Sequence, residues 1–430
     1  MLKEVIEEMA RQENGMVGTW RSYIDAQRQD TVNRCTACGD CFSVCPIVSL
    51  TPLQGASPEA VVAGVLDVLR GRPAPAEAVA WAEACTRCGL CIELCPERVN
   101  PRKMLALCEG LAHEAAGSQA GSQFFRLMSQ NTRLLSGLQL SRQQLADIQG
   151  PSQAQADVVF YVGCNVLSTP HIILNVMDIL SALGVDYRVA GGVGYCCGAI
   201  HFIGGELDAA GKVTTNLFAK LAAFQPRTVL TWCPTCEMHL GETVAGSDDH
   251  AFDVQHVSDF LAAHLDVLKE RMSSPIPRRI ALHGHGGHPH ISDNVRRLLG
   301  AIPGLDVVEL DDGGELGYSC NVGGLLRIPS LQAEVQARVW QQARAAGASE
   351  LVDLYHGCHR LLWDEEGLRI RNFTDLLIEA MGLPDHEDRF QRYREMPGVQ
   401  QVIEAARDLM RENGIEEADV EGVYPSLFRR

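Results

Sequence analysis

Eight cysteines in the N-terminal part of the chain fall into two runs with the same spacing. The runs are Cys35-x2-Cys38-x2-Cys41-x3-Cys45-Pro46 and Cys85-x2-Cys88-x2-Cys91-x3-Cys95-Pro96. Three thiolates spaced in this way can bind three iron atoms of a cubane, whereas the fourth, before a chain-turning proline, is displaced toward a neighbouring cluster. The spacing therefore predicts two [4Fe–4S] clusters.

The displaced fourth cysteines predict that the two runs exchange ligands. The first four-cysteine group is expected to be Cys35, Cys38, Cys41 and Cys95, and the second Cys85, Cys88, Cys91 and Cys45. The alternative is a pair of structural zinc sites, but zinc ribbons use two CxxC pairs rather than four cysteines in each run. Cys108 lies outside both runs and is interpreted as a small buried residue.

Five further cysteines form a second kind of pattern, the five-cysteine group of Cys164, Cys196, Cys197, Cys233 and Cys236. Gly194 and Gly198 flank the adjacent pair, and glycine lets a backbone turn sharply enough to present both sulfurs to one cluster. The alternative is a redox-active CxxC at Cys233 and Cys236 in a thioredoxin-like setting. That alternative leaves Cys164 and the adjacent pair unexplained.

The elements that must position these residues repeat along the chain. Strands are predicted at 157–162, 185–190, 228–232, 279–283, 305–310 and 351–355, and helices at 60–70, 102–115, 171–183, 206–224, 291–299 and 332–346. The alternation beyond residue 157 predicts two α/β units with parallel sheets, whose loops beyond the strand ends carry the cysteines. The part before residue 116 is predicted to be mainly helical.

The second copy of the repeat has lost most of the cysteine pattern. Gly286 stands at the first cysteine, Ser319 and Cys320 at the pair, and His356 and His359 at the CxxC. A candidate metal-binding set remains, and zinc would suit it: His285, His288, Cys320, His356, Cys358 and His359. The alternatives are a decayed cluster site with a packing role, a histidine-ligated Fe–S centre, and a substrate or quinone contact.

These motifs resemble known families. The two runs with their helical insert resemble the α-helical ferredoxin domain found in fumarate reductase iron–sulfur subunits and in the C subunit of heterodisulfide reductase, and the five-cysteine group resembles the cysteine-rich CCG domain. The combination, over about residues 30–385, resembles one superfamily. Its members include the fused heterodisulfide reductase subunits such as the D subunit, the iron–sulfur subunits of glycolate oxidase and of the sulfite-reduction-associated membrane complex, and the small subunit of anaerobic glycerol-3-phosphate dehydrogenase.

The resemblance implies an α+β multidomain protein. Its expected parts are an α-helical ferredoxin domain (1–115), a linker (116–156), a first CCG domain with intact cysteines (157–275), a second CCG domain with a degenerate set (276–385) and an unassigned C-terminal tail (386–430). It also implies that the five-cysteine group holds a third cluster. In heterodisulfide reductase such a set holds a noncubane [4Fe–4S] cluster, at which a disulfide is cleaved.

Composition limits the class of protein. The formal net charge of −17 disfavours a nucleic-acid partner. No apolar run reaches about 18 residues, and Met1–Gln12 does not look like a signal peptide. We therefore expect a cytoplasmic protein, or one that is peripheral on the cytoplasmic face of a membrane. Sixteen cysteines in such a chain indicate metal or redox chemistry rather than disulfides.

The leading functional hypothesis is an iron–sulfur electron-transfer subunit of a multi-subunit oxidoreductase. It would relay electrons between a partner dehydrogenase or flavoprotein and a quinone or thiol/disulfide acceptor, with a membrane quinone-reactive subunit as a further partner. The sequence carries no nicotinamide or flavin fingerprint, so a partner chain must supply that chemistry. The alternative is a catalytic heterodisulfide reductase subunit, and a third hypothesis is an assembly or sensing factor that uses its clusters structurally.

Overall fold

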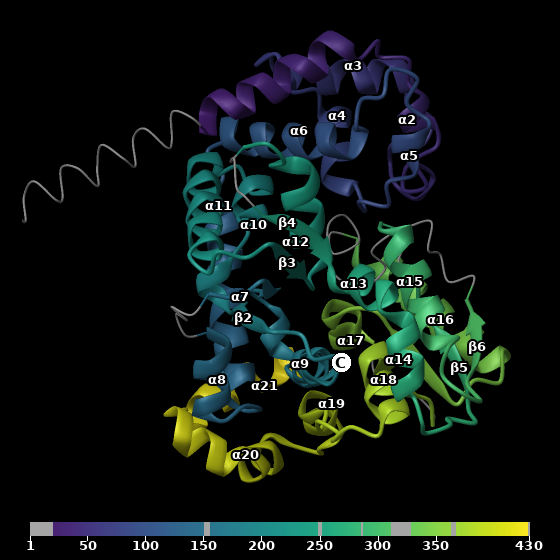
Figure 1. Cartoon of the computed structure of the whole chain (residues 1–430). Coiled ribbons are helices and arrows are strands. Elements are labelled where there is room, and N and C mark those ends of the chain that lie inside the picture. The colour runs from purple at the N-terminus through teal and green to yellow at the C-terminus, as the bar shows by residue number, and fades with distance from the viewer. Residues whose placement is uncertain are drawn as a thin grey trace, which may run out of the picture.

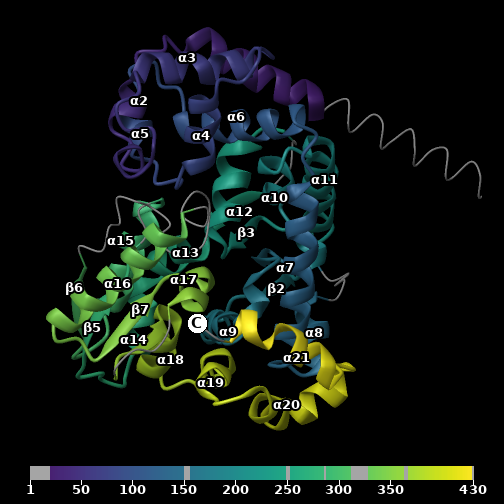
Figure 2. The same ribbon diagram turned by 180° about the vertical axis from the view of Figure 1, so that it is seen from behind.

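The computed structural model describes residues 20–149, 155–247, 252–284, 287–310, 328–362 and 367–428. A helical N-terminal domain lies at one end of the molecule, and α20 and α21 lie at the opposite end (Figure 1). Two α/β units, called here the first and second repeat units, lie between these ends. The view from behind shows the same arrangement (Figure 2).

The N-terminal domain is helical, as predicted. It contains a helix over 20–34, α2 (Asp40–Ser43), a 3-10 turn (Val48–Leu50), α3 (Pro58–Leu69), α4 (Ala76–Ala84), α5 (Leu90–Glu93) and α6 (Pro101–Ala115). The longer helix that follows each run, α3 after the first and α6 after the second, begins in the same way. Ser57 caps α3 and Asn100 caps α6 with side-chain oxygens that accept from backbone N–H groups, and each cap is followed by a proline at the first helical position.

The first repeat unit is a parallel four-stranded sheet with the order β2-β1-β3-β4. Its elements are β1 (Val158–Gly163), α9 (His171–Ala182), β2 (Tyr187–Gly191), α10 (Ala199–Ile203), α11 (Leu207–Ala222), β3 (Thr228–Thr231), α12 (Pro234–Met238), β4 (Asp253–His256), α13 (Val257–Ala263) and α14 (Leu265–Arg271). Short helical turns at Val166–Ser168, Val193–Tyr195 and His239–Thr243 complete it.

The second repeat unit has the same sheet order, β6-β5-β7-β8, and is also parallel. Its elements are β5 (Arg279–Leu282), α15 (Pro289–Leu299), β6 (Asp306–Glu309), α16 (Pro329–Ala345), β7 (Glu350–Asp353), α17 (His356–Leu361), β8 (Arg369–Asn372) and α18 (Phe373–Met381). The predicted α+β multidomain class, with two tandem α/β units, is therefore confirmed.

Each sheet contains one strand that the sequence analysis missed. The missed strands are β4 and β8, which lie at the sheet edges and span only four residues each, DVQH and RIRN. An edge strand has one neighbour and is rich in polar residues here, so it lacks the apolar run that marked the central strands.

The two repeat units share one hydrophobic core. Helix α9 of the first unit packs on α18 of the second, and Trp232 stacks on Phe373 with ring centroids 5.7 Å apart and planes 8° from parallel. Buried residues from both sheets, among them Phe160, Leu230, Ile280 and Leu351, belong to the same cluster. The loops beyond the strands of one unit are therefore held against the other unit.

A further helical layer crosses the repeat units. The stretch expected as a linker contains α7 (Ala120–Gly137) and α8 (Arg142–Gln149), and the C-terminal segment contains α19 (Arg389–Glu395), α20 (Val399–Asn413) and α21 (Glu417–Leu427). Leu135 of α7 and Leu138, directly after its last residue, pack with Tyr393 and Met410 in one hydrophobic core. The Tyr393 hydroxyl donates to the carbonyl of Leu138 at 2.7 Å.

In the parts of the chain described above, no helix combines the length and the apolar character needed to cross a membrane.

Candidate iron–sulfur sites

The first four-cysteine group lines one small cavity. Cys35, Cys38 and Cys41 line it from the first run and Cys95 from the second, with Met104 of α6 behind them. Burial raises the pKa of the Cys41 thiol to about 12, and the neighbouring thiols of Cys35, Cys38 and Cys95 contribute in the same direction. Four cysteines that line one small cavity fit a cluster that would bind their sulfurs as thiolates.

The second four-cysteine group has the complementary arrangement. Burial raises the pKa of Cys45 to about 11, and the next contribution comes from Cys85. Burial also raises the pKa of Cys91, which lies within electrostatic range of Cys85, Cys88 and Cys45. The structure thus brings together the four sulfurs that the exchange of ligands between runs would require.

The backbone of both runs curls in the same unusual way. Ala37 and Arg87, at equivalent positions, have φ of +59° and +62°, and the glycines two residues later, Gly39 and Gly89, have φ of +87° and +81°. Left-handed residues at this density turn successive N–H groups toward a common centre, which is how backbone loops surround anionic groups. This repeated turn explains why glycine stands at the second of these positions in each run.

Trp81 contacts the second four-cysteine group directly. Its side chain is fully buried, and its indole N–H donates to Cys45 Sγ at 3.4 Å. The cysteine spacing gave no reason to single out this tryptophan, which lies on α4 in the insert between the runs.

Replacing Trp81 with phenylalanine is expected to make the midpoint potential of the cluster on this group more negative. An N–H···S bond stabilises the more negatively charged reduced state, and a loss of ~1 kcal/mol corresponds to about 40 mV for one electron. A redox titration followed by electron paramagnetic resonance measures the shift. Trp20→Phe is the matched control, because Trp20 is also buried and its indole N–H makes no hydrogen bond within the described residues. Equal potentials in both variants would contradict this role.

The five-cysteine group lies at the carboxyl ends of three neighbouring strands. Cys164 follows β1, Cys196 and Cys197 follow β2, and Cys233 and Cys236 follow β3. Side-chain contacts connect the sulfurs in one series, from Cys164 through Cys196, Cys197 and Cys236 to Cys233. Cys164 and Cys233 at the two ends of the series are partly exposed, whereas the other three are buried.

Hydrogen bonds between the thiols prepare two of them for ionisation. The bond from Cys164 lowers the pKa of Cys196 well below its usual value, and a bond from Cys197 acts in the same direction. The bond from Cys236 lowers the pKa of Cys233. Conversely, the pKa values of Cys164 and Cys197 are raised by the hydrogen bond with Cys196 and by burial, and that of Cys236 by the hydrogen bonds with Cys197 and Cys233 and by burial. A compact set of thiols with two favoured thiolates fits the binding of a metal cluster.

Of the two glycines beside the cysteine pair, only Gly198 adopts a left-handed conformation. Its φ is +94°, and its N–H donates to Cys196 Sγ at 3.4 Å, whereas Gly194 does not have positive φ. The prediction that both glycines serve the turn is therefore correct for Gly198 alone. Trp232 and Tyr195, which directly precede Cys233 and Cys196, are both buried.

Replacing Gly198 with alanine is expected to remove the third cluster. The new Cβ would lie 2.6 Å from Thr214 Oγ1 and 2.9 Å from the carbonyl oxygen of Ala210, in a conformation that costs about 1–2 kcal/mol without the clash. Gly246→Ala is the control, since Gly246 has φ of +80° and no atom of the described residues lies within 4 Å of the added Cβ. Iron analysis of both purified variants measures the effect, and full iron content in Gly198→Ala would refute it.

The N-terminal domain meets both repeat units at Arg102 of α6. Its guanidinium donates to both carboxylate oxygens of Glu242, with Nε 3.0 Å from Oε2, and Nη1 donates to the carbonyl of Gly287 at 2.7 Å. The Arg102 side chain is only 7% exposed. A charge that is buried and paired in this way holds the two domains in one relative position.

A narrow cavity beside Arg102 separates the second four-cysteine group from the five-cysteine group. Its lining includes Arg87, between Cys85 and Cys88, and Ala199, Thr235 and His239 of the first repeat unit. Ala199 comes two residues after Cys197, and Thr235 precedes Cys236. Residues that neighbour cysteines of both groups in the chain therefore line one cavity beside Arg102.

The candidate metal set of the second repeat unit is only partly described, because His285 and Cys320 lie outside the described residues. The other four members, His288, His356, Cys358 and His359, are buried. Cys358 is disulfide-bonded, so its sulfur is not available as the predicted metal ligand. Burial lowers the pKa of both His288 and His356 to about 3, so both imidazoles are neutral at pH 7. His359 lies against two residues outside the predicted set, His171 and Asp388.

Sequence reasoning had no signal for these two residues. His171 was expected only as the first residue of a helix, and Asp388 lay in the unassigned C-terminal tail. His171 and Asp388 lie far from His359 in the chain and form no sequence motif with it. The three residues meet only because α9 and α19 pack on the second repeat unit.

Comparison with known proteins agrees with this arrangement. A 4Fe-4S dicluster domain matches residues 34–100, and a cysteine-rich domain matches residues 158–241. The chain is 25% identical over 396 residues to the D subunit of dihydromethanophenazine:CoB–CoM heterodisulfide reductase from Methanosarcina mazei, a match that covers 82% of this chain and 94% of that protein. The B subunit of fumarate reductase (CoM/CoB) from Methanothermobacter marburgensis is 24% identical over 382 residues, or 83% of this chain and 74% of that protein.

The corresponding D subunit from Methanosarcina barkeri is similar to the same extent, with 23% identity over 82% of this chain and 94% of that protein. The chain therefore carries a 4Fe-4S dicluster domain followed by a cysteine-rich domain, and over most of its length it is similar to the D subunits of heterodisulfide reductase.

Proposed function

We propose that this chain is an iron–sulfur electron-transfer subunit of a multi-subunit oxidoreductase. The observation that carries the proposal is the placement of thirteen cysteines in three groups, with chain neighbours of the second four-cysteine group and of the five-cysteine group lining one cavity beside Arg102. When bound, [4Fe–4S] clusters would supply one-electron transfer at each group.

The residues around the groups define an order of transfer. Cys41 of the first group lies within electrostatic range of Cys91 of the second, so the two four-cysteine groups are neighbours. Arg102 and Glu242 then hold the second group toward the first repeat unit. We infer a relay from the first group through the second to the five-cysteine group, or the reverse, with partner chains at its two ends.

The partner chains would supply the flavin or nicotinamide chemistry for which this chain carries no sequence motif. We propose a flavin-containing dehydrogenase or another redox subunit as one partner, and a membrane quinone-reactive subunit or a thiol/disulfide acceptor as the other. The similarity to subunits of heterodisulfide reductase and of a fumarate reductase supports the presence of redox partner subunits.

The relay is tested by following reduction in time. Protein purified without oxygen is mixed with a limiting one-electron reductant, frozen at successive times and examined by electron paramagnetic resonance. We expect the signals of the two four-cysteine groups to appear first and then to decay as the third cluster is reduced. In Glu242→Gln, which weakens the contact with Arg102, the second step is expected to slow. Absence of any Fe–S signal in the anaerobic protein would overturn the proposal.

A second candidate is a catalytic thiol–disulfide reductase that uses the five-cysteine group as its active centre. The partial exposure of Cys164 and Cys233 supports it, because small thiols could reach the group at both ends. This candidate predicts a new paramagnetic signal when the oxidised protein is mixed with a small thiol. An unchanged spectrum over a wide range of thiol concentrations would remove it.

A further inference from the structure

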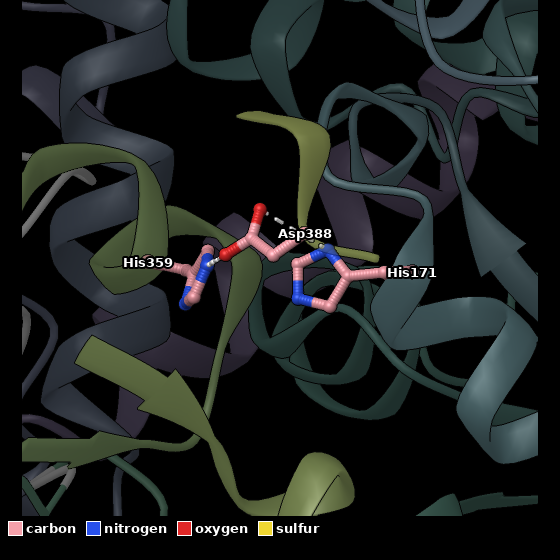
Figure 3. A group of neighbouring side chains, drawn as sticks. All are labelled: His171, His359 and Asp388. Carbon is pink, nitrogen blue, oxygen red and sulfur yellow. Dashed lines mark hydrogen bonds and ion pairs between the residues drawn. The ribbon is translucent and has the colours of Figure 1, made fainter. Parts of the chain in front are cut away.

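Three side chains from three different parts of the chain converge between the repeat units. His171 is the first residue of α9 in the first unit, His359 lies on α17 in the second, and Asp388 caps α19 in the C-terminal segment. One donor atom from each lies within 4.8 Å of the other two (Figure 3). We propose that this point is a zinc site, with His171, His359 and Asp388 as ligands.

Each histidine has a carboxylate on the side away from the others. Asp353 lies 2.9 Å from His359 Nδ1, which leaves Nε2 directed at Asp388. Asp375 lies 3.9 Å from His171 Nε2, and Nδ1 of the same ring is 3.5 Å from Asp388. In metal sites a carboxylate behind the imidazole fixes the ring and makes the opposite nitrogen a better ligand.

These outer carboxylates are themselves held in place. Asn372 Nδ2 donates to Asp353 at 2.8 Å, and Asn175 Nδ2 donates to Asp375 at 2.7 Å. Asp388 accepts the backbone N–H of Gln391 on one oxygen, and its other oxygen faces His359 Nε2 at 2.6 Å. The donor set is therefore built into the surrounding hydrogen bonds rather than being free on a surface.

The buried imidazole of His171 lacks hydrogen-bond partners within the described residues. It is 2% exposed, and within the described residues neither of its ring nitrogens makes a hydrogen bond. Buried polar groups are nearly always paired, so an orphaned imidazole pointing at a carboxylate indicates a missing partner. A protonated His359 that donates from Nδ1 to Asp353 and from Nε2 to Asp388 would satisfy His359 alone, whereas a metal ion would satisfy both histidines.

Charge and ligand type both favour a divalent transition metal. Three carboxylates, Asp353, Asp375 and Asp388, surround two imidazoles, and Arg371 approaches only Asp375, at 3.9 Å. The remaining negative charge would be offset by a divalent cation. Two imidazoles and one carboxylate are a common zinc set, whose donor atoms lie about 3.3 Å apart. The distance between His359 Nε2 and the nearer Asp388 carboxylate oxygen, now 2.6 Å, would increase by less than about 1 Å to reach that spacing.

Solvent can reach the site from one side. A pocket of about 220 Å³ is lined by His171 and by Glu387 and Arg389, which flank Asp388. The Asp388 side chain is 23% exposed, whereas the two histidines are buried. The partly exposed Asp388 carboxylate, between two residues that line this pocket, gives a path of entry for the ion.

Zinc here would join the two repeat units beside the five-cysteine group. Arg360, next to His359, donates to Asn165 Oδ1 at 3.2 Å, and Asn165 follows Cys164. The ion would therefore fix the relative position of α9, α17 and α19 and, through Arg360, the loop that carries Cys164. This proposal does not depend on the electron-relay function.

The test uses the full chain with its iron–sulfur clusters, purified without oxygen, stripped of loosely bound metal by a chelator and titrated with Zn²⁺. We expect one tightly bound zinc per chain, with nitrogen and oxygen ligands at about 2.0–2.2 Å in the zinc X-ray absorption spectrum. His171→Ala is expected to weaken zinc binding at least about 100-fold, and Asp353→Asn, as an outer-shell change, about 10–100-fold.

His386→Ala is the matched control. His386 lines the same pocket and pairs with Asp178 at 2.8 Å, but it lies outside the donor set, so zinc binding should not change. Zinc with sulfur ligands, or no zinc binding in the wild-type chain, would overturn the proposal. Iron content is measured in each sample, so loss of a cluster is separated from loss of zinc, and the wild-type spectrum decides the question even where a variant fails to fold.

Discussion

Replacing Cys197 with alanine is expected to lower the iron content from about 12 to about 8 atoms per chain, the loss of one four-iron cluster of three. Cys197 is buried at the centre of the five-cysteine series, where it contacts both Cys196 and Cys236. Its removal divides the series into two separate pairs, so no arrangement of the remaining thiols reproduces the original set. The four-cysteine groups lie in another domain and should keep their signals.

Cys108→Ala provides the control for this variant. Cys108 is fully buried on α6 and lies outside all three groups, so its replacement tests the loss of a buried sulfur without the loss of a ligand. Iron analysis and electron paramagnetic resonance of the two variants, prepared side by side, give the result. Retention of about 12 irons in Cys197→Ala would mean that this sulfur is dispensable and that the group binds a cluster through the other four cysteines.

Replacing Glu109 with alanine is expected to destabilise the N-terminal domain by about 3–5 kcal/mol, the usual cost of leaving one member of a buried ion pair alone. Glu109 on α6 accepts from Arg87 Nη2 at 2.6 Å, and their side chains are only 2% and 5% exposed. Arg87 lies between Cys85 and Cys88, so its unpaired charge would also disturb the loop of the second four-cysteine group. Thermal unfolding and the rate of iron release measure both effects.

Two further variants sharpen this test. Glu404→Ala removes a helical ion pair, Glu404 with Arg407, but both side chains are more than half exposed, so unfolding should not change measurably. The double variant Arg87→Met with Glu109→Leu removes both charges and should recover most of the lost stability. If the double variant were no more stable than Glu109→Ala, the loss would come from packing and not from an uncompensated charge.

The sequence was most informative where chemistry requires a fixed spacing. The cysteines could be grouped because a cluster limits how far apart its ligands can lie, and the central strands could be found because both of their faces are buried. The edge strands β4 and β8 escaped notice because four polar-rich residues carry no periodic signal. Trp81, Arg102 and Asp388 could not be found because their roles depend on tertiary contacts between segments distant in the chain.

The helical layer formed by α7, α8 and α19–α21 has a consequence for the order of maturation. The N-terminal domain has all eight cysteines of its two runs and its last helix once residue 115 has been synthesised, so iron can be inserted there early. The apolar face of α7 with Leu135 and Leu138, in contrast, stays without its covering residues until Tyr393 and Met410 emerge. Asp388 is synthesised shortly before these two residues. The segment from Asp388 onward therefore completes a joint between segments that were synthesised long before it.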